Sequence, residues 1–237
     1  TRVDGARDVV WHITTDDQLA ATFYRNSIIH VFLNSGLCEI ALVLAAQEPP
    51  GPGRIEAFWR WVMELRDVLK FEFYFKDRAE FRRQIESEVA RSGADWEERL
   101  AADPVDVRAL LVPRAPLTAA FMLRPFIEAY LIVADVVSRL DGEIDKAATI
   151  TEALALGEQF LAQKRIQSAE PVSALLFETG LKVMANRGLL AAAPDREARV
   201  NAFEDELEGR VLAAIITIED LMFSLFVRDR QRLSPSG

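Results

Sequence analysis

The amino-acid sequence predicts an all-α protein, a multi-helix array of about eight to ten helices that ends in a long C-terminal helix. Apolar residues recur at helical spacing along most of the 237 residues, and glycine (11) and proline (10) are both scarce. From residue 194 to about residue 232 one apolar stripe continues, which predicts the long terminal helix. The members of this stripe are Leu207, Val211, Ile215, Ile218, Met222 and Leu225.

The N-terminal part predicts two helices in succession. Residues 14–17 (Thr-Thr-Asp-Asp) supply N-cap chemistry for a helix that runs to about residue 33. Asn34-Ser35-Gly36 predicts an interruption before a second helix, which reaches Ala46. Residues 47–53 are rich in proline and glycine, so we expect an exposed loop and a candidate sub-boundary there, within one helical domain that spans residues 1–237.

Three further helices are expected after this loop. Residues 54–70 predict an amphipathic helix, and residues 78–91 and 96–102 predict shorter, more polar ones. Residues 71–76 partly alternate between apolar and polar side chains, which predicts a short extended segment before an N-cap at Asp77.

A long helix is predicted at residues 117–140, and Pro125 inside it should kink or restart the backbone. Its charged residues Arg124, Glu128, Asp135 and Arg139 fall near one face. We expect this face to be solvated, with each i, i+4 pair contributing only ~0.2–0.5 kcal/mol.

The next segment predicts two more helices, at residues 150–163 and 172–185. Asn186-Arg187-Gly188 predicts that the second of them stops in a left-handed turn.

Composition excludes some classes of partner and suggests another. A net charge of -9 and a pI near 4.9 argue against nucleic-acid binding, which requires clustered Lys and Arg. The single cysteine, Cys38, cannot form an internal disulfide and is expected to be buried. Half of the residues are apolar, which predicts that a partner domain or a membrane face covers part of the surface.

No segment is expected to cross a membrane. The most apolar stretches lie at residues 27–46, 118–137 and 211–227, and charged or polar residues interrupt each of them. We therefore expect any membrane contact to be peripheral.

The sequence lacks the usual metal, cofactor and nucleophile motifs. Neither of the two histidines follows a glutamate at i-3, and one cysteine cannot form a cysteine-rich metal site. There is no Gly-x-Ser-x-Gly elbow, phosphate-binding loop or dinucleotide fingerprint. We expect neither a bound metal nor a cofactor, and no independent enzyme.

A line of polar side chains runs along the first predicted helix. Thr22, Asn26, His30 and Asn34 recur every four residues, with Arg25 beside them, among apolar and aromatic neighbours. Such a helix should be covered by packed neighbours, and its polar line should then find hydrogen-bond partners.

These residues also carry a family resemblance. Tyr24-Arg25-Asn26, followed by two aliphatic residues, His30 and an aromatic residue, resembles the start of the C-terminal region of membrane-associated glycerol-3-phosphate 1-O-acyltransferases. The likeness continues in order through residues 65–75, 124–130 and 170–199. It implies the non-catalytic C-terminal helical domain of a larger protein, in keeping with a sequence that begins with Thr.

The resemblance implies where the chemistry lies. The family uses a His-x4-Asp pair for acyl transfer, and His12 to Asp17 has that spacing, but here it sits directly before the Tyr-Arg-Asn block without the family's other motifs. Asp17 is also explained as a helix-capping residue, so we expect no catalytic residue in this chain and no activity from it alone.

The implied partners are an upstream acyltransferase domain and, through it, acyl-CoA or acyl carrier protein thioester and glycerol 3-phosphate, on the cytoplasmic side of a membrane. Arg25, Asn26 and His30 are candidates for substrate binding or a domain interface, and packing alone would also explain them. A stand-alone helical module that binds a hydrophobic ligand or regulates another protein is the alternative, because fold class does not decide function.

Overall fold

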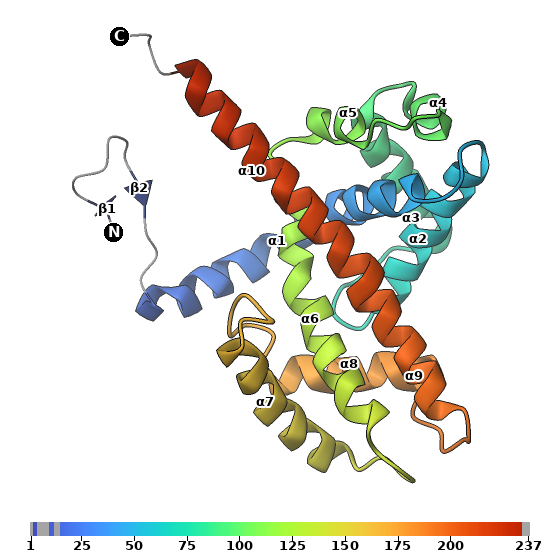
Figure 1. Ribbon diagram of the computed structural model, residues 1–237, viewed down its shortest axis with the longest axis vertical. Coiled ribbons are helices and arrows are strands. Elements are labelled where there is room, and N and C mark those ends of the chain that lie inside the picture. Colours follow the sequence, from blue (N-terminus) through green and yellow to red (C-terminus); the bar gives the residue numbers. More distant parts are fainter. Residues whose placement is uncertain (1, 4–9, 12–14, 234–237) are drawn as a thin grey trace.

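A computed structural model describes the backbone of residues 2–3, 10–11 and 15–233, and the side chains of residues 28–226. This part of the chain is all-α, as predicted, apart from a two-residue antiparallel pair formed by β1 (Arg2–Val3) and β2 (Val10–Trp11) (Figure 1). The α-helices are α1 (Thr15–Ala46), α2 (Gly53–Leu69), α3 (Arg78–Val89), α4 (Trp96–Ala101), α5 (Val107–Leu111), α6 (Ala119–Ser138), α7 (Lys146–Ala162), α8 (Ala174–Asn186), α9 (Arg196–Asp205) and α10 (Ala213–Leu233). Between them lie the 3-10 turns η1 (Ala90–Ser92) and η2 (Val112–Arg114) and the π-helical segment η3 (Glu206–Leu212).

The predicted break at Asn34-Ser35-Gly36 is wrong, because α1 is one continuous helix. A Cβ atom added to Gly36 would lie 2.8 Å from the carbonyl oxygen of Ala119, at the start of α6. Glycine is therefore needed here for the close approach of two helices, and not to end one of them. The described part of α1 begins at Thr15, and Thr14 of the predicted N-cap lies outside the described residues.

Helix α6 is the centre of the fold and packs against α1, α7, α8, α9 and α10. It is buried along nearly its whole length, including Tyr130 and Ile132. The predicted restart at Pro125 is not observed: α6 continues through this buried proline as one helix. Its neighbours on both sides of Pro125 hold the helix in place where one backbone hydrogen bond is missing.

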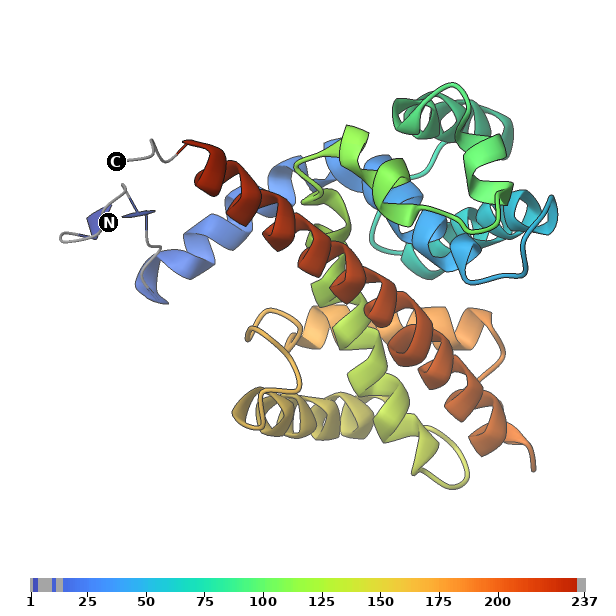
Figure 2. The same cartoon turned by 45° about the horizontal axis from the view of Figure 1, so that its top comes forward.

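The predicted long C-terminal helix is confirmed as α9, η3 and α10, which follow one another without a gap. Leu207, Val211, Ile215 and Ile218 of the predicted stripe are buried, while Met222 and Leu225 are partly buried against the same core. Figures 1 and 2 both show the C-terminal half of α10 and the N-terminal half of α1 projecting to the same side of the helical body.

Several local predictions are confirmed. Asp77 caps α3 by accepting hydrogen bonds from the amides of Ala79 and Glu80, both at 3.0 Å. Gly188, with φ of 71°, ends α8 in the left-handed conformation. Cys38 is fully buried, and its burial raises the pKa of the thiol. These features follow from local chemistry, which sequence patterns report well.

The membrane prediction needs a correction. Residues Ile28–Ala46 of α1 are long and apolar enough to span a membrane, with a mean hydropathy of 1.9, and 72% of this stretch is buried inside the protein. Residues Val107–Arg114 and Ala119–Ser138 would pass the same test only as one span, and they are bent by 106°. The apolar surface of residues 28–46 is thus largely occupied by the protein's own core.

Candidate functional site

The predicted polar line on α1 is only partly described. The side chains of Thr22, Arg25 and Asn26 lie outside the described residues, as do His12 and the side chain of Asp17. His30 is exposed, and so are its neighbours Ile28 (49%) and Val31 (67%).

The fourth member of the line, Asn34, is half-buried and donates to Gln84 Oε1 at 3.3 Å. The expectation that packed neighbours cover this helix therefore holds for its second half, and within the described part of the chain it fails at Ile28, His30 and Val31.

Two charged residues of α6 are buried against α10, where a solvated face was predicted. Arg124 Nε donates to Glu128 Oε1 at 2.7 Å, and Arg124 Nη1 donates to both carboxylate oxygens of Glu219 at 3.0 and 2.9 Å. All three residues are buried, and we call them the α6–α10 cluster. Burial raises the pKa of the Glu128 carboxyl, while Arg124 acts in the opposite direction.

The other pair of the predicted face behaves as expected. Arg139 Nη2 donates to Asp135 Oδ1 at 2.5 Å, and the Arg139 side chain is largely exposed. The prediction of a solvated face is thus wrong for the N-terminal end of α6, where Arg124 and Glu128 are buried with Glu219 of α10, and it holds at the C-terminal end for Arg139.

A second buried network joins α1, α3, η2 and α6. Arg114, whose side chain is completely buried, donates to Glu88 Oε1 at 2.8 Å and to Ser35 Oγ at 3.0 Å. The Ser35 hydroxyl donates to Glu39 Oε1 at 3.2 Å, and Glu39 Oε2 accepts from the amide of Ala120 at 2.9 Å. We call Ser35, Glu39, Glu88 and Arg114 the Arg114 cluster.

The Arg114 cluster also caps a helix. Thr118, the N-cap residue of α6, makes no capping hydrogen bond with its side chain, and Glu39 from α1 satisfies an amide of the first turn instead. Burial raises the pKa of Glu39 to about 7, although the Ala120 amide and Arg114 lower it. Sequence reasoning missed this cluster, and its one visible signal was a lone carboxylate, Glu39, inside an apolar run.

Exposed apolar side chains lie beside the α6–α10 cluster. Phe121 of α6 is 41% exposed, and Ile216 and Phe223 of α10 are 44% and 61% exposed. Ile28 and Val31, near the middle of α1, are likewise large apolar groups exposed to solvent. Apolar groups gathered in this way are typical of a surface that another protein segment covers.

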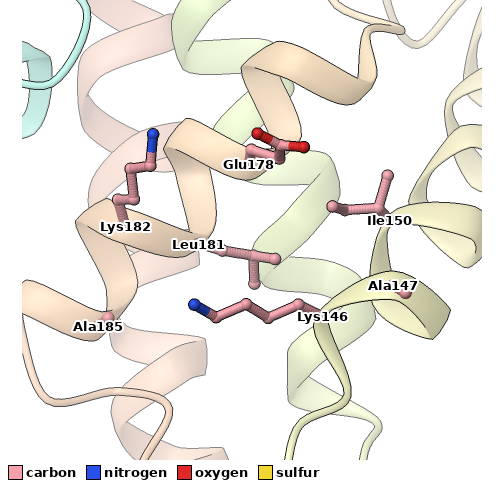
Figure 3. A pocket seen from close by; sticks show the side chains of 7 residues that line it. All are labelled: Lys146, Ala147, Ile150, Glu178, Leu181, Lys182 and Ala185. Carbon is pink, nitrogen blue, oxygen red and sulfur yellow. The ribbon is translucent and has the colours of Figure 1, made fainter.

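A groove of about 330 Å³ lies between α7 and α8 (Figure 3). Lys146 from the first turn of α7 and Glu178 and Lys182 from α8 surround the buried side chain of Leu181. The three charged residues are exposed, so the groove is open to solvent and differs from the enclosed apolar cavity that a hydrophobic ligand requires.

The described residues hold charged networks but no arrangement suited to acyl transfer. His30 is exposed on α1, and no group of three potential metal ligands is brought together among the side chains of residues 28–226. The buried Cys38 thiol has a raised pKa and would not ionise to act as a nucleophile.

The comparison with protein families places this all-helical chain. It belongs to the family described as the glycerol-3-phosphate acyltransferase C-terminal region, which matches residues 1–193. The resemblance carried by the Tyr24-Arg25-Asn26 block is thereby confirmed.

Curated relatives come from mycobacteria. The chain is 37% identical over 213 residues to proteins of Mycobacterium bovis and of two strains of Mycobacterium tuberculosis that carry the provisional name acyltransferase plsB1. The match covers 86% of this chain and 34% of each relative, so the chain spans about a third of their length. No solved structure matches.

Proposed function

We propose that this chain is the non-catalytic C-terminal helical domain of a glycerol-3-phosphate 1-O-acyltransferase and that it packs against an upstream acyltransferase domain. In the reaction of the whole protein, the 1-hydroxyl of glycerol 3-phosphate attacks the thioester carbonyl of acyl-CoA or acyl carrier protein. The ester bond forms, the carbon–sulfur bond breaks, and the free thiol leaves with a proton. The product is 1-acylglycerol 3-phosphate, used in phospholipid synthesis.

The observation that carries this proposal is the pair of projecting helix halves with exposed apolar side chains. Val31 and Phe223 are both more than 60% exposed, although the core beneath them is well packed. Leaving such groups in water is unfavourable by about 25 cal/mol per Å² of apolar surface, so a surface of this kind favours a covering partner. The relatives' greater length supplies the chain from which such a partner could come.

Arg25, Asn26 and His30 belong to this proposed interface. All three lie in the projecting half of α1, so a domain docked on that half would meet them. A role for Arg25 in binding the phosphate of the substrate is the sharper version of the proposal, because a guanidinium binds phosphate with two parallel hydrogen bonds.

We also propose that the assembled protein lies at the cytoplasmic membrane surface through peripheral contacts. Its support is the family's membrane association and the extensive burial of residues 28–46, the apolar stretch of α1 that is long enough to span a bilayer. The stand-alone ligand-binding module receives less support, because the groove between α7 and α8 is open and lined by charged residues.

The proposal is tested in the complete protein that contains this chain. A protease site placed just before Thr1 allows the folded protein to be cut, and the two pieces are then separated and assayed for transfer of a palmitoyl group from palmitoyl-CoA to glycerol 3-phosphate. The C-terminal piece should be inactive, and mixing the pieces should restore activity lost on separation. Acyl transfer by the C-terminal piece alone would overturn the proposal.

A further inference from the structure

The α6–α10 cluster has one more carboxylate than it has cations. Arg124 forms ion pairs with both Glu128 and Glu219, at 2.7 and 2.9 Å, and among the described side chains no other ion pair involves these two carboxylates. Arg108, the other cation bonded to α10, bonds Ser224 at 3.4 Å, more than one turn beyond Glu219. With all three groups ionised, the cluster carries a net charge of about -1. Arg124 and Glu219 keep 8% and 7% of their surface exposed.

The Arg114 cluster is a matched comparison within the same molecule. It too has two carboxylates around one buried arginine, yet Glu88 Oε1 also accepts from Arg91 Nη1 at 2.9 Å. Its other carboxylate, Glu39, accepts from Ser35 and from the Ala120 amide. This cluster is therefore balanced in charge, whereas the α6–α10 cluster has no second cation among the side chains of residues 28–226.

The unbalanced cluster lies next to the exposed apolar side chains. On α10, Ile216 and Phe223 are one turn before and one turn after Glu219, and on α6, Phe121 is one turn before Arg124. Since α6 and α10 run in roughly opposite directions (Figures 1 and 2), Phe121 and Phe223 lie toward the same end of the cluster. An uncompensated carboxylate bordered by exposed aromatic groups matches the anatomy of a binding hot spot before its partner arrives.

We propose that the docked partner, the upstream acyltransferase domain, inserts an arginine or lysine side chain that pairs with Glu128 and Glu219 while its apolar residues cover Phe121 and Phe223. This inference rests on the proposed function and specifies the chemistry of its interface. The same charge balance excludes Arg124 as a site for the phosphate of glycerol 3-phosphate or CoA, because an anion would meet a cluster that is already negative.

An interface with a partner cation at the cluster and an interface without one predict opposite effects of neutralising Glu128 on domain association. If the cluster is complete on its own, Glu128→Gln removes surplus charge and leaves domain association unchanged or stronger. If a partner cation pairs with it, the same change leaves that cation buried without its counter-charge and weakens association.

The experiment uses the complete protein, folded intact and then cut before Thr1, and measures the dissociation constant of the two pieces by dilution and size-exclusion chromatography. Glu128→Gln and Glu219→Gln should each raise that constant by at least about tenfold. Asp135→Asn, which removes the ion pair with the exposed Arg139 at the other end of α6, should not change it. Circular dichroism of each uncut variant checks that it is folded. If one of the two glutamine variants does not fold, the other provides the test.

Two further variants separate this inference from the proposed function. Phe121→Ser and Phe223→Ser should also weaken association, since they remove apolar contacts of the same interface. If the two serine variants weaken association while the glutamine variants leave the dissociation constant unchanged or lower it, the proposed partner cation is refuted. Docking at this surface then stands. If none of the four variants changes the constant, docking at this surface is refuted as well.

Discussion

The Arg114 cluster and the α6–α10 cluster are built from the same parts and differ in one respect. Each places a buried arginine between two glutamates contributed by different helices. The Arg114 cluster finds a second arginine, a serine and a helix N-terminus within the chain, whereas the α6–α10 cluster stops at three charged groups beside exposed phenylalanines. One side of the chain thus balances its buried charges by itself, and the other side has the surplus carboxylate for which we propose a partner cation.

The largest effect is expected from breaking the closed cluster. Arg114→Met removes the buried cation beside Glu39 and Glu88 and leaves Glu39 buried without it, which should lower the free energy of unfolding by about 3–5 kcal/mol. Urea unfolding of the complete protein measures this loss. The control is Arg91→Ala, which removes the exposed arginine that also pairs with Glu88 and should cost less than about 1 kcal/mol. Equal losses of stability for the two variants would contradict the distinction between the buried Arg114 and the exposed Arg91.

The next effect is a pH dependence centred on Glu39. The folded-state pKa of this carboxyl is about 7, above its ordinary value of 4.5, so the folded state holds a proton that the unfolded state has released between these values. Stability should therefore fall as the pH rises from about 4.5 to 7, by at most ~1.4 kcal/mol per pH unit from this group.

Glu39→Gln should flatten that slope, as measured by urea unfolding at a series of pH values. The half-buried Glu204, whose pKa is also raised to about 7, provides the comparison variant Glu204→Gln. A slope that is unchanged by Glu39→Gln would show that the Glu39 carboxyl does not titrate in this range.

A smaller effect is expected where α1 approaches the start of α6. Gly36→Ala would place a Cβ 2.8 Å from the backbone oxygen of Ala119, so α1 and α6 must separate, at a cost of about 1–3 kcal/mol. In Gly209→Ala, the new Cβ meets nothing within 4 Å, and the change should stabilise the helix by about 0.5–1 kcal/mol. Thermal unfolding should therefore give a lower midpoint for Gly36→Ala and a higher one for Gly209→Ala. A stabilising Gly36→Ala would refute the role of Gly36 in the close contact of α1 with α6, on which the Glu39–Ala120 hydrogen bond depends.

The smallest effect is expected at the surface of α6. Asp135→Asn breaks the ion pair with the exposed Arg139 and should change stability by no more than about 0.5 kcal/mol. Arg124→Met, in the buried pair on the same helix, is the contrasting variant and should cost several times more. Similar midpoints of urea unfolding for both variants would remove the contrast between the two ends of α6.

Most helices could be predicted from the sequence because their signals are local: an aspartate cap at Asp77, a glycine stop at Gly188 and an apolar stripe from Leu207 onward. The break at Gly36 was mispredicted because a glycine that ends a helix and a glycine that admits a neighbouring helix look the same in sequence.

The buried clusters could be predicted only in part. Charges in apolar segments, such as the isolated Glu39 and the Glu219-Asp220 pair, do indicate buried partners. Their partners lie 81 and 95 residues away in the chain, however, and only the packing of α1 and α10 on α6 brings them together. The functional candidates Arg25, Asn26 and His30 were identified from the motif that resembles the family, and their roles stay predictions.

The central claim, that the projecting halves of α1 and α10 carry the partner, is tested most directly by hydrogen–deuterium exchange. The complete protein is compared with the C-terminal piece released from it by cutting before Thr1. We expect amides around Val31 and around Phe223 to exchange more slowly in the complete protein, and those of α7 and α8 to exchange at the same rate in both samples. Equal exchange around Val31 and Phe223 in the two samples would contradict it.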